Sequence, residues 1–402
     1  MTLLENDDAL PLSGDENVLL TGPFVDGDAA LHAQMGGWTL GWQGIMADSA
    51  RPWATTLREG VADAIGAGSV TVEQTGFTFQ PWQNGDGYAF DNEEAVRAAA
   101  ADADAVVVTI GEGPHSEGYG DRDELALPDA QQAVVAAVAD AAGDDTPVVG
   151  VEFAGSPRGG ARTFEHLDAL LMAYQPGSAG GSAVARTLYG EHVPSGRLPF
   201  VWPQHVGQAT NHYNAYPPSR GNDPLYEFGR GLSYTSFEYA DLAVEPGTVE
   251  SAAERDAVTV SVTVTNTGDH AGYHVVEAYN TQSYGSVLQP NRRLLGTERV
   301  SLDPGESARV EVEAPLRTLS VVPGAIPGVE GKRVEAGDYE VSVGDQTATL
   351  TVAETASAGE GEPIPVETDD DWSPGNSDDG NGRGPPDDKP GNGNGLLGRL
   401  LD

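Results

Sequence analysis

Short apolar runs alternate with helix-like stretches over the first half of the chain. The runs are continuous and cover residues 17–22, 69–73, 105–110, 147–153 and 169–174. Alanine-rich segments with helical spacing lie between them, at 55–65, 93–101, 130–141 and 179–189. Uninterrupted apolar strands that alternate with helices indicate a sheet that is buried on both faces. We therefore predict, for residues 1–235, an α/β sandwich whose mostly parallel sheet is flanked by helices.

The hydrophobic pattern changes to a two-residue period after residue 236. In the segment 258–265, four valines alternate with Thr and Ser, as expected for a half-buried antiparallel strand. Similar alternations recur at 308–313, 339–343 and 348–352. About seven short strands over such a length are typical of an immunoglobulin-like β-sandwich. We predict this all-β domain at 236–353 and assign it a packing role, because it shows no nucleophile or base.

The remaining residues, 354–402, contain few apolar side chains, many acidic ones and repeated Gly-Asn pairs. Such a segment cannot bury enough apolar surface to offset the entropy lost on ordering. We predict a disordered acidic tail rich in Gly, Asn and Pro.

Charge and composition narrow the classes of function. The 402 residues include 62 Asp and Glu against 21 Lys and Arg, which gives a net charge of −41. A surface this negative repels phosphate, so we exclude nucleic acid as a partner. The absence of Cys excludes a disulfide framework, thiolate catalysis and Cys-ligated metals. We see no apolar run that could span a membrane and no signal peptide, and therefore predict no membrane association and a cytoplasmic location.

The acidity also indicates an adaptation to salt. Lys332 and Lys389 are the only lysines, and short carboxylates are spread along the whole sequence. This pattern resembles the proteins of salt-in halophiles. Like charges repel one another more strongly when the screening length is long, so we predict that the chain unfolds in low salt.

The segment 111–121, Gly-Glu-Gly-Pro-His-Ser-Glu-Gly-Tyr-Gly-Asp, follows the third apolar run. A carboxylate just past a parallel strand lies at the ligand-binding edge of such a sheet. There, partial burial and neighbouring acids can raise its pKa enough for it to act as a general acid near neutrality. Glu112 and Glu117 are the candidates, and His115 and Asp121 lie close to them in sequence.

Two tryptophans occupy a Gly-rich segment after the first run. Trp38 directly follows Gly36 and Gly37, and we predict that its ring stacks on a sugar. Trp42 we interpret as a core anchor. The histidines His192, His205 and His212 show no metal-ligand spacing, so we predict no metal and no cofactor and read them as surface or packing residues.

These segments together resemble the C-terminal half of glycoside hydrolase family 3, the β-glucosidase and exo-β-glucanase group. The resemblance rests on Gly36–Thr39 with Trp42–Gly44, Val108–Glu112, Gly120–Asp121, Tyr174–Ser178, Pro194–Pro199 and Pro224–Tyr234. Two segments of the second domain, Leu302–Glu306 and Ala336–Tyr339, resemble the fibronectin-III-like domain that follows in the same family.

The resemblance implies a retaining mechanism on a β-glucoside or β-glucan oligosaccharide. An Asp on an N-terminal (β/α)8 barrel would form a glycosyl-enzyme, and a Glu of the α/β domain would act as acid and then as base. The family's Gly-Glu pair places this role on Glu112, with Glu117 as the alternative in the same loop. Trp38 would flank the aglycone subsite, and His115 and Asp121 would contact substrate.

The sequence departs from the family pattern at two places. Residues 2–12 resemble the segment that normally follows the barrel, so we expect the barrel and its nucleophile to be missing from this chain, through a truncated gene or because a separate subunit carries them. The turn Phe153–Gly159 also differs from the usual Ser-Gly-Arg-Pro turn.

Two hypotheses follow from these observations. In the first, the chain is the C-terminal part of a β-glucosidase-type enzyme and is inactive alone. In the second, it is a non-catalytic carbohydrate-binding or scaffold protein. Turnover with a separately encoded barrel would favour the first, and sugar binding by the isolated chain the second.

Overall fold

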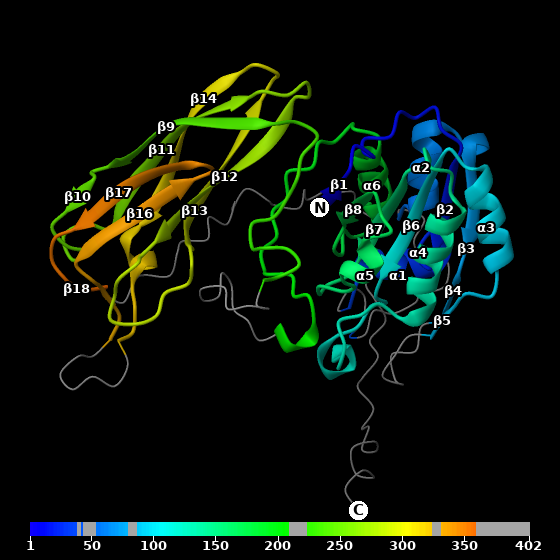
Figure 1. Cartoon of the computed structure of the whole chain (residues 1–402), viewed down its shortest axis with the longest axis horizontal. Helices are drawn as coiled ribbons and strands as arrows, with labels where there is room; N and C mark the ends of the chain where they lie inside the picture. Colours follow the sequence, from blue (N-terminus) through cyan, green and yellow to red (C-terminus); the bar gives the residue numbers. More distant parts are fainter. Residues whose placement is uncertain (38–41, 43–53, 79–86, 209–222, 324–330, 359–402) are drawn as a thin grey trace, which may run out of the picture. The chain divides into compact units, whose positions relative to one another are not determined.

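The computed structural model describes residues 1–37, 42, 54–78, 87–208, 223–323 and 331–358. The first region contains a six-stranded sheet in the order β1-β8-β7-β6-β2-β3 (Figure 1). Its strands are β1 (Thr2–Asn6), β2 (Val18–Gly22), β3 (Val70–Gln74), β6 (Ala105–Gly111), β7 (Val148–Phe153) and β8 (Ala169–Met172). All neighbouring strands are parallel except β1, which pairs antiparallel with β8. The predicted mostly parallel sheet is confirmed.

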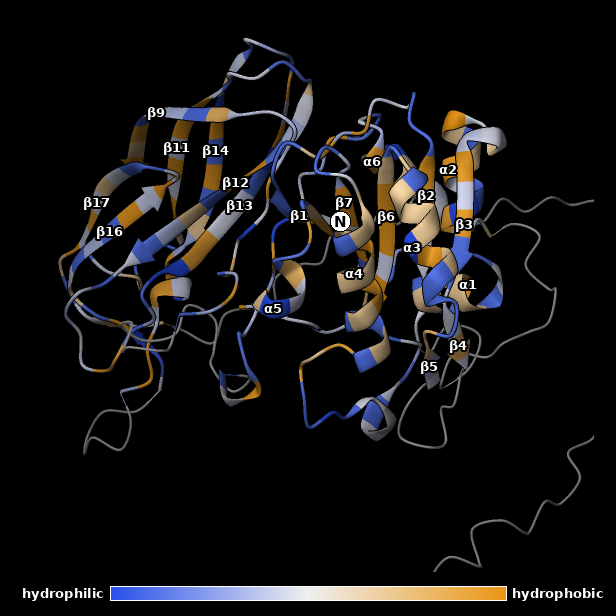
Figure 2. Cartoon of the chain, turned by 45° about the vertical axis from the view of Figure 1, so that its right-hand side comes forward, coloured by the Kyte–Doolittle hydropathy of each residue, from blue (hydrophilic) through white to orange (hydrophobic). Residues whose placement is uncertain are grey.

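Helices cover both faces of this sheet. On one face lie α1 (Gly27–Met35), α2 (Leu57–Ile65) and α6 (Gly180–Leu188), and on the other α3 (Glu93–Asp102), α4 (Asp129–Ala141) and α5 (Ala161–Phe164). Within β6, Val107 packs into the first core and its neighbours Val106 and Val108 into the second. Burial on both sides explains why the strand sequences are largely apolar runs, and Figure 2 shows β6 as mostly hydrophobic.

Local signals fix the start of α2 and its packing on α6. The Thr56 side chain accepts a hydrogen bond from the Glu59 backbone N–H, and the Glu59 carboxylate accepts one from the Thr56 N–H, which forms a capping box. On α6, a Cβ atom at Gly181 would lie 2.1 Å from the Thr56 carbonyl oxygen. The close approach of the two helices therefore requires glycine at this position.

The first strand has neighbours on both of its sides. Besides its pairing with β8, Leu3 forms an isolated antiparallel bridge with Leu232. The Leu232 N–H donates to the Leu3 carbonyl at 2.8 Å, and the Arg230 guanidinium donates to the Leu4 carbonyl at 2.9 Å. The last segment of this region thus closes over its first strand.

The second region consists of two main sheets, which are antiparallel except that β10 pairs parallel with β17. Three strands, in the order β14-β11-β9, are β9 (Phe237–Glu245), β11 (Ala257–Asn266) and β14 (Ser307–Pro315). Five strands, in the order β10-β17-β16-β12-β13, are β10 (Thr248–Val249), β12 (Gly272–Thr281), β13 (Arg293–Leu302), β16 (Gly337–Val343) and β17 (Gln346–Val352). Valines of β11 alternate into one shared core, and the strands show alternating polar and apolar bands in Figure 2. The predicted β-sandwich is confirmed.

Smaller elements complete the described part of the chain. A short hairpin joins β4 (Gly76–Thr78) and β5 (Gly87–Ala89), and β15 (Arg333–Val334) pairs with β18 (Ala356–Ser357). The predicted disorder from residue 354 is therefore wrong for 354–358, because backbone pairing with β15 orders this segment; residues 359–402 lie outside the described residues. Among the residues that the structure describes, no helix is long and apolar enough to cross a membrane.

Candidate functional site

Buried charge is concentrated at one edge of the six-stranded sheet. Among the described residues, only three Asp, Glu, Lys or Arg residues are buried: Glu112, Glu152 and Arg158. Glu112 directly follows β6, Glu152 is the last but one residue of β7, and Arg158 comes five residues after that strand. Charged groups are rarely buried unless they are paired. Their gathering at the carboxyl ends of two adjacent parallel strands marks this edge as the candidate site.

Glu112 is fixed through both of its carboxylate oxygens. Oε1 accepts hydrogen bonds from the backbone N–H groups of Gly155 at 2.9 Å and Ser156 at 3.2 Å, and from the Ser156 hydroxyl at 3.0 Å. Oε2 lies 3.0 Å from Nε2 of His115 and 3.9 Å from Nε of Arg158. The His115 contact is an ion-pair distance without good hydrogen-bond alignment. The Glu112 side chain thus has little room to move.

The surroundings of Glu112 favour its ionised form. Burial by itself would raise the pKa of its carboxyl group, but the contact with His115, the charge of Arg158 and the Gly155 N–H outweigh burial and lower the pKa. A carboxylate with a lowered pKa that accepts three hydrogen bonds holds a proton poorly. The geometry therefore suits Glu112 to anchoring its loop better than to donating a proton.

Glu152 is the opposite case. It is fully buried, and burial followed by the negative charge of Glu112 raises the pKa of its carboxyl well above the usual value. Its Oε1 accepts a hydrogen bond from the Arg158 backbone N–H at 3.3 Å, and its Oε2 has no hydrogen-bond partner among the described residues. The two buried carboxyl groups at this edge therefore have opposite pKa shifts, and Arg158 contacts one through its guanidinium group and the other through its backbone N–H.

Glu117 lies at the outer part of the same loop. It is exposed, it opens the 3₁₀ helix η2 (Glu117–Gly120), and its backbone has φ of 54°. A positive φ is uncommon for a residue other than glycine and is found preferentially at functional sites. Asp121, directly after η2, is also exposed. His115 is partly buried, with 20% of its side chain exposed.

Two motifs far apart in the sequence meet at this loop. A Cβ atom at Gly37 would lie 2.2 Å from the Ser116 hydroxyl and 2.3 Å from the His115 carbonyl oxygen. Only a residue without a side chain allows the Gly36–Gly37 segment to approach so closely. The Gly-rich segment and the acidic loop, which are separate candidates in the sequence, therefore form one surface.

The structure places the two predicted tryptophans unequally. Trp38, the predicted sugar-stacking residue, lies outside the described residues. Trp42 is 38% exposed, so its interpretation as a core anchor is wrong. It lies on a turn rather than on a strand or helix, which leaves its ring partly open to solvent.

The histidines outside the loop give no sign of a metal site. His192 and His205 are exposed, as predicted, and His212 lies outside the described residues. In the described part of the chain, no group of three or more His, Cys, Asp or Glu side chains could hold a metal ion.

Three contributors to the site were not recognised from the sequence. Glu152 interrupts the apolar run of β7, and a carboxylate inside such a run was the available signal. Arg158 lies in the turn that departs from the family pattern. The third, Tyr88, comes from the β4–β5 hairpin, and its hydroxyl accepts a hydrogen bond from the Gly113 N–H at 3.1 Å. No local pattern could have brought it here.

A cavity of about 400 Å³ opens beside these residues. Its walls include Tyr88, Glu112, Arg122 and Arg158. It combines an aromatic side chain with fixed polar groups, which is the usual character of a small-molecule site.

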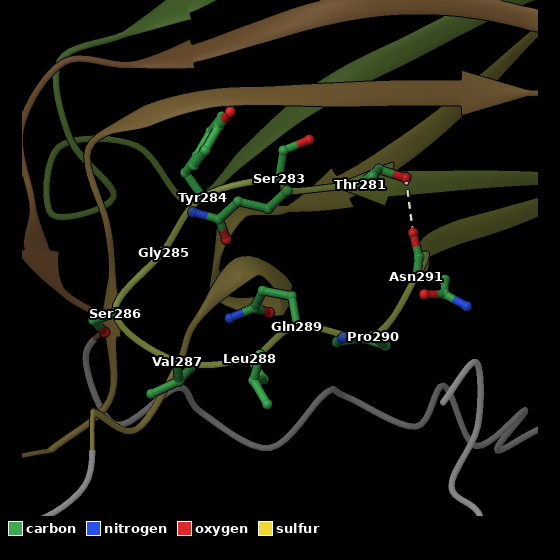
Figure 3. A pocket seen from close by; sticks show the side chains of 11 residues that line it. Thr281, Ser283, Tyr284, Gly285, Ser286, Val287, Leu288, Gln289, Pro290 and Asn291 are labelled. Carbon is green, nitrogen blue, oxygen red and sulfur yellow. Dashed lines mark hydrogen bonds between the residues drawn. The ribbon is translucent and has the colours of Figure 1, made fainter. Parts of the chain in front are cut away.

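The second region also contains a hollow, of about 630 Å³, within the β12–β13 connection (Figure 3). Its lining, residues 281–291, carries no charged side chain, and the Thr281 hydroxyl donates to the Asn291 carbonyl at 3.0 Å. In Figure 3 the Tyr284 and Leu288 side chains point away from the middle of this loop. The hollow therefore lacks the buried charge that singles out the edge near Glu112.

The sheet order and the flanking helices define the first region as an α/β sandwich with a candidate site at its strand ends, and a β-sandwich follows it. Comparison with known families agrees. Residues 1–234 match the glycosyl hydrolase family 3 C-terminal domain, and residues 274–347 match the fibronectin type III-like domain. The chain belongs to glycosyl hydrolase family 3.

Several relatives are β-glucosidases. The lysosomal beta glucosidase of Dictyostelium discoideum is 32% identical over 87% of this chain and 42% of its own length. The periplasmic beta-glucosidase of Salmonella typhimurium is 29% identical over 85% of this chain and 48% of its own. The crystal structure of a mutant beta-glucosidase from Listeria innocua in complex with laminaribiose has a TM-score of 0.71 and 27% identity, and covers 87% of this chain and 47% of that one. This chain thus spans about half the length of these proteins.

Proposed function

We propose that this chain contributes the acid/base half of a retaining β-glucosidase-type active site. One observation carries the proposal: the only buried charged side chains in the described part of the α/β region surround the base of a loop that presents an exposed glutamate. The β-glucosidase relatives and the laminaribiose-bound structure support a terminal β-glucosidic bond as the target. The nucleophile would be an Asp of a (β/α)8 barrel, supplied within a longer polypeptide or as a separate chain.

Within the loop we assign proton transfer to Glu117 and anchoring to Glu112. Glu112 is buried, its pKa is lowered, and its carboxylate already accepts three hydrogen bonds. Glu117 is exposed at a strained backbone position and can face a bound ligand. This assignment reverses the order expected from the sequence, in which Glu112 came first. Asp121, His115 and Trp38 stay proposed substrate contacts.

The chemistry then runs in two steps. In the first, the Glu117 carboxyl gives its proton to the glycosidic oxygen while the barrel Asp attacks the anomeric carbon, which releases the alcohol and forms a glycosyl-enzyme. In the second, the Glu117 carboxylate takes a proton from water, whose oxygen attacks the same carbon and frees the Asp. The cycle returns both carboxyl groups to their starting states.

The test measures hydrolysis of aryl β-glucosides by the barrel-containing assembly in high salt. For Glu117→Ala, we expect turnover of a substrate with a poor leaving group to fall about 10²–10⁴-fold, because such a leaving group needs the proton. A substrate with a good leaving group should lose far less in its first step. Added azide, which needs no general base, should restore turnover and yield a glucosyl azide.

Asp123→Asn, an exposed change in the same loop, is the matched control and should leave turnover unchanged. If Glu112→Gln shows the leaving-group dependence and azide rescue instead, proton transfer belongs to Glu112. Tryptophan fluorescence during a laminaribiose titration measures sugar binding. Binding without turnover in any assembly would favour the non-catalytic binding protein. Residues 1–402 alone should show no turnover, and strong turnover by them would contradict the proposal that a barrel Asp supplies the nucleophile.

A further inference from the structure

We propose that Glu112 and Arg158 form a two-point clamp that fixes the acid/base loop, residues 113–127, onto the turn after β7. The two are positioning residues that act through the loop. The catalytic consequence rests on the proposed function above, whereas the clamp itself rests only on contacts within this chain.

Glu112 holds the beginning of the loop. Its backbone N–H donates to the Phe153 carbonyl at 2.9 Å, in line with the β6–β7 ladder. Its Oε1 takes the N–H groups of Gly155 and Ser156 together with the Ser156 hydroxyl. Three donors on one oxygen join the residue just before the loop to the neighbouring turn.

Arg158 holds the end of the loop. Its Nη1 donates to the Glu124 carbonyl at 2.7 Å and its Nη2 to the Ala126 carbonyl at 2.9 Å. The N–H of the next residue, Gly159, donates to the Leu125 carbonyl at 2.8 Å. Three consecutive carbonyl groups of the loop are therefore bound by two consecutive residues of the turn.

An ion pair links the two attachment points of the loop. Nε of Arg158 lies 3.9 Å from Oε2 of Glu112, both side chains are less than a tenth exposed, and the Arg158 backbone donates to Glu152. Removing one member of such a buried pair leaves the other uncompensated, so each half depends on the other. Only Arg, with its forked donors, can serve two carbonyls and a carboxylate at once.

Between the clamped ends lie residues 113–123, which include Glu117, Asp121 and the contact with Gly37. A clamped loop keeps a carboxyl group in the narrow range of positions that proton transfer requires. The clamp thus makes the Gly-rich loop rigid, so that the Glu117 carboxyl group is held in place.

Hydrogen exchange of the full chain in high salt, read by mass spectrometry or NMR, tests the clamp directly. In Arg158→Met, we expect the Gly159 amide to exchange at least about tenfold faster, and the Gly155 and Ser156 amides to follow because the halves are coupled. Arg158→Lys covers the case in which Arg158→Met does not fold, since Lys keeps the charge but cannot bridge both carbonyls. Arg162→Met changes an exposed arginine in the same connection and should leave these amides unaffected.

Unchanged exchange at Gly159 in both Arg158 variants would overturn the clamp. It would also be overturned if the effect of Glu112→Gln on the exchange rates simply added to the effect of either Arg158 variant. Activity of the barrel-containing assembly tests its consequence separately. Arg158→Lys should lower kcat more for poor leaving groups than for good ones and leave KM nearly unchanged. Faster exchange with no effect on activity would retain the clamp and contradict the proposed acid/base role of the loop.

Discussion

The two folded regions of this chain manage charge differently, although the sequence is acidic throughout. In the α/β region, two carboxyl groups and a guanidinium group are buried together at the carboxyl ends of β6 and β7. In the sandwich, the buried core described here is built from valine, leucine, alanine and tyrosine, and none of its buried residues is an Asp, Glu, Lys or Arg. Burying a charge costs free energy, so a fold accepts it only where the charge serves a purpose. Surface acidity is therefore uninformative here, whereas buried charge locates the site.

The largest effect is expected from lowering the salt concentration, because unfolding would remove the contrast between the two regions. Transfer from molar to millimolar KCl should unfold both regions, because the Debye length grows from about 3 Å at 1 M to about 30 Å at 0.01 M and the negative charges then repel one another. Circular dichroism and calorimetry across a KCl series measure the effect. A melting temperature that does not change with salt would contradict the proposed adaptation to salt.

The next prediction compares two arginines that each donate to two carbonyl groups. Arg158→Met should lower the free energy of unfolding by about 3–5 kcal/mol, because it removes the guanidinium partner of the buried Glu112 charge. Arg293 of β13 donates to the carbonyls of Thr318 and Ser320, and among the described residues no buried carboxylate lies beside it. Arg293→Met should therefore cost only about 1–2 kcal/mol.

Chemical denaturation in high salt measures both values. Equal losses for the two variants would show that the lost carbonyl contacts, rather than the buried charge, set the cost. The contrast between the two regions would then have no energetic basis.

A smaller effect tests a buried histidine of the sandwich. His274 is 5% exposed and stacks on Phe237 at 4.1 Å between ring centroids, and Tyr239 contacts its Nε2. Burial, and then the charge of Arg197, lower the pKa of His274 to about 4. The folded state thus binds fewer protons than the unfolded state between about pH 6.5 and pH 4. Stability is full above this window and falls as the pH drops through it, by at most about 3 kcal/mol.

Denaturation at about pH 7 and about pH 4.5 should show this loss in the wild type and lose most of it in His274→Gln. His270→Gln, at an exposed position, is the control and should retain the wild-type pH dependence. The same pH dependence in all three proteins would place its origin among the carboxylates.

The smallest effect is expected at the surface. Arg186 and Glu191 form an ion pair at 3.3 Å with side chains 63% and 62% exposed. Glu191→Gln should change the free energy of unfolding by less than about 0.5 kcal/mol, because water and salt screen such a pair. A loss of unfolding free energy as large as that of Arg158→Met would mean that solvent exposure does not decide how much an ion pair of this protein contributes to stability.

The sequence predicted those parts of the fold in which buried residues form a regular pattern of apolar positions. Strands β2, β6, β7 and β8 are buried on both faces, and their apolar runs were recognised. The α1 helix was missed because it buries His32 and Gln34 beside its alanines, which breaks the apolar pattern. Strand β12 was missed because its pairing with β13 contains a bulge between Ala278 and Tyr279, which interrupts the alternation.

The site was predictable only where it is local. Glu112, His115 and Glu117 are neighbours in sequence, and a loop after a parallel strand is where chemistry is expected. Glu152 reaches this edge because β6 and β7 pair in a register that places Ile110 opposite Glu152. Register and turn geometry are properties of the folded sheet, so the contacts that distinguish Glu112 from Glu117 could not be read from the sequence.

The pairing of strand β1 has a consequence for how the chain folds during synthesis. Strand β1 leaves the ribosome well before its hydrogen-bond partners, β8 and Leu232, which are made much later. Contacts this distant in sequence form slowly, and an unpaired apolar strand is prone to aggregation until they form. Leu3 and Leu4 therefore stay without their strand partners until nearly the whole α/β region has been translated.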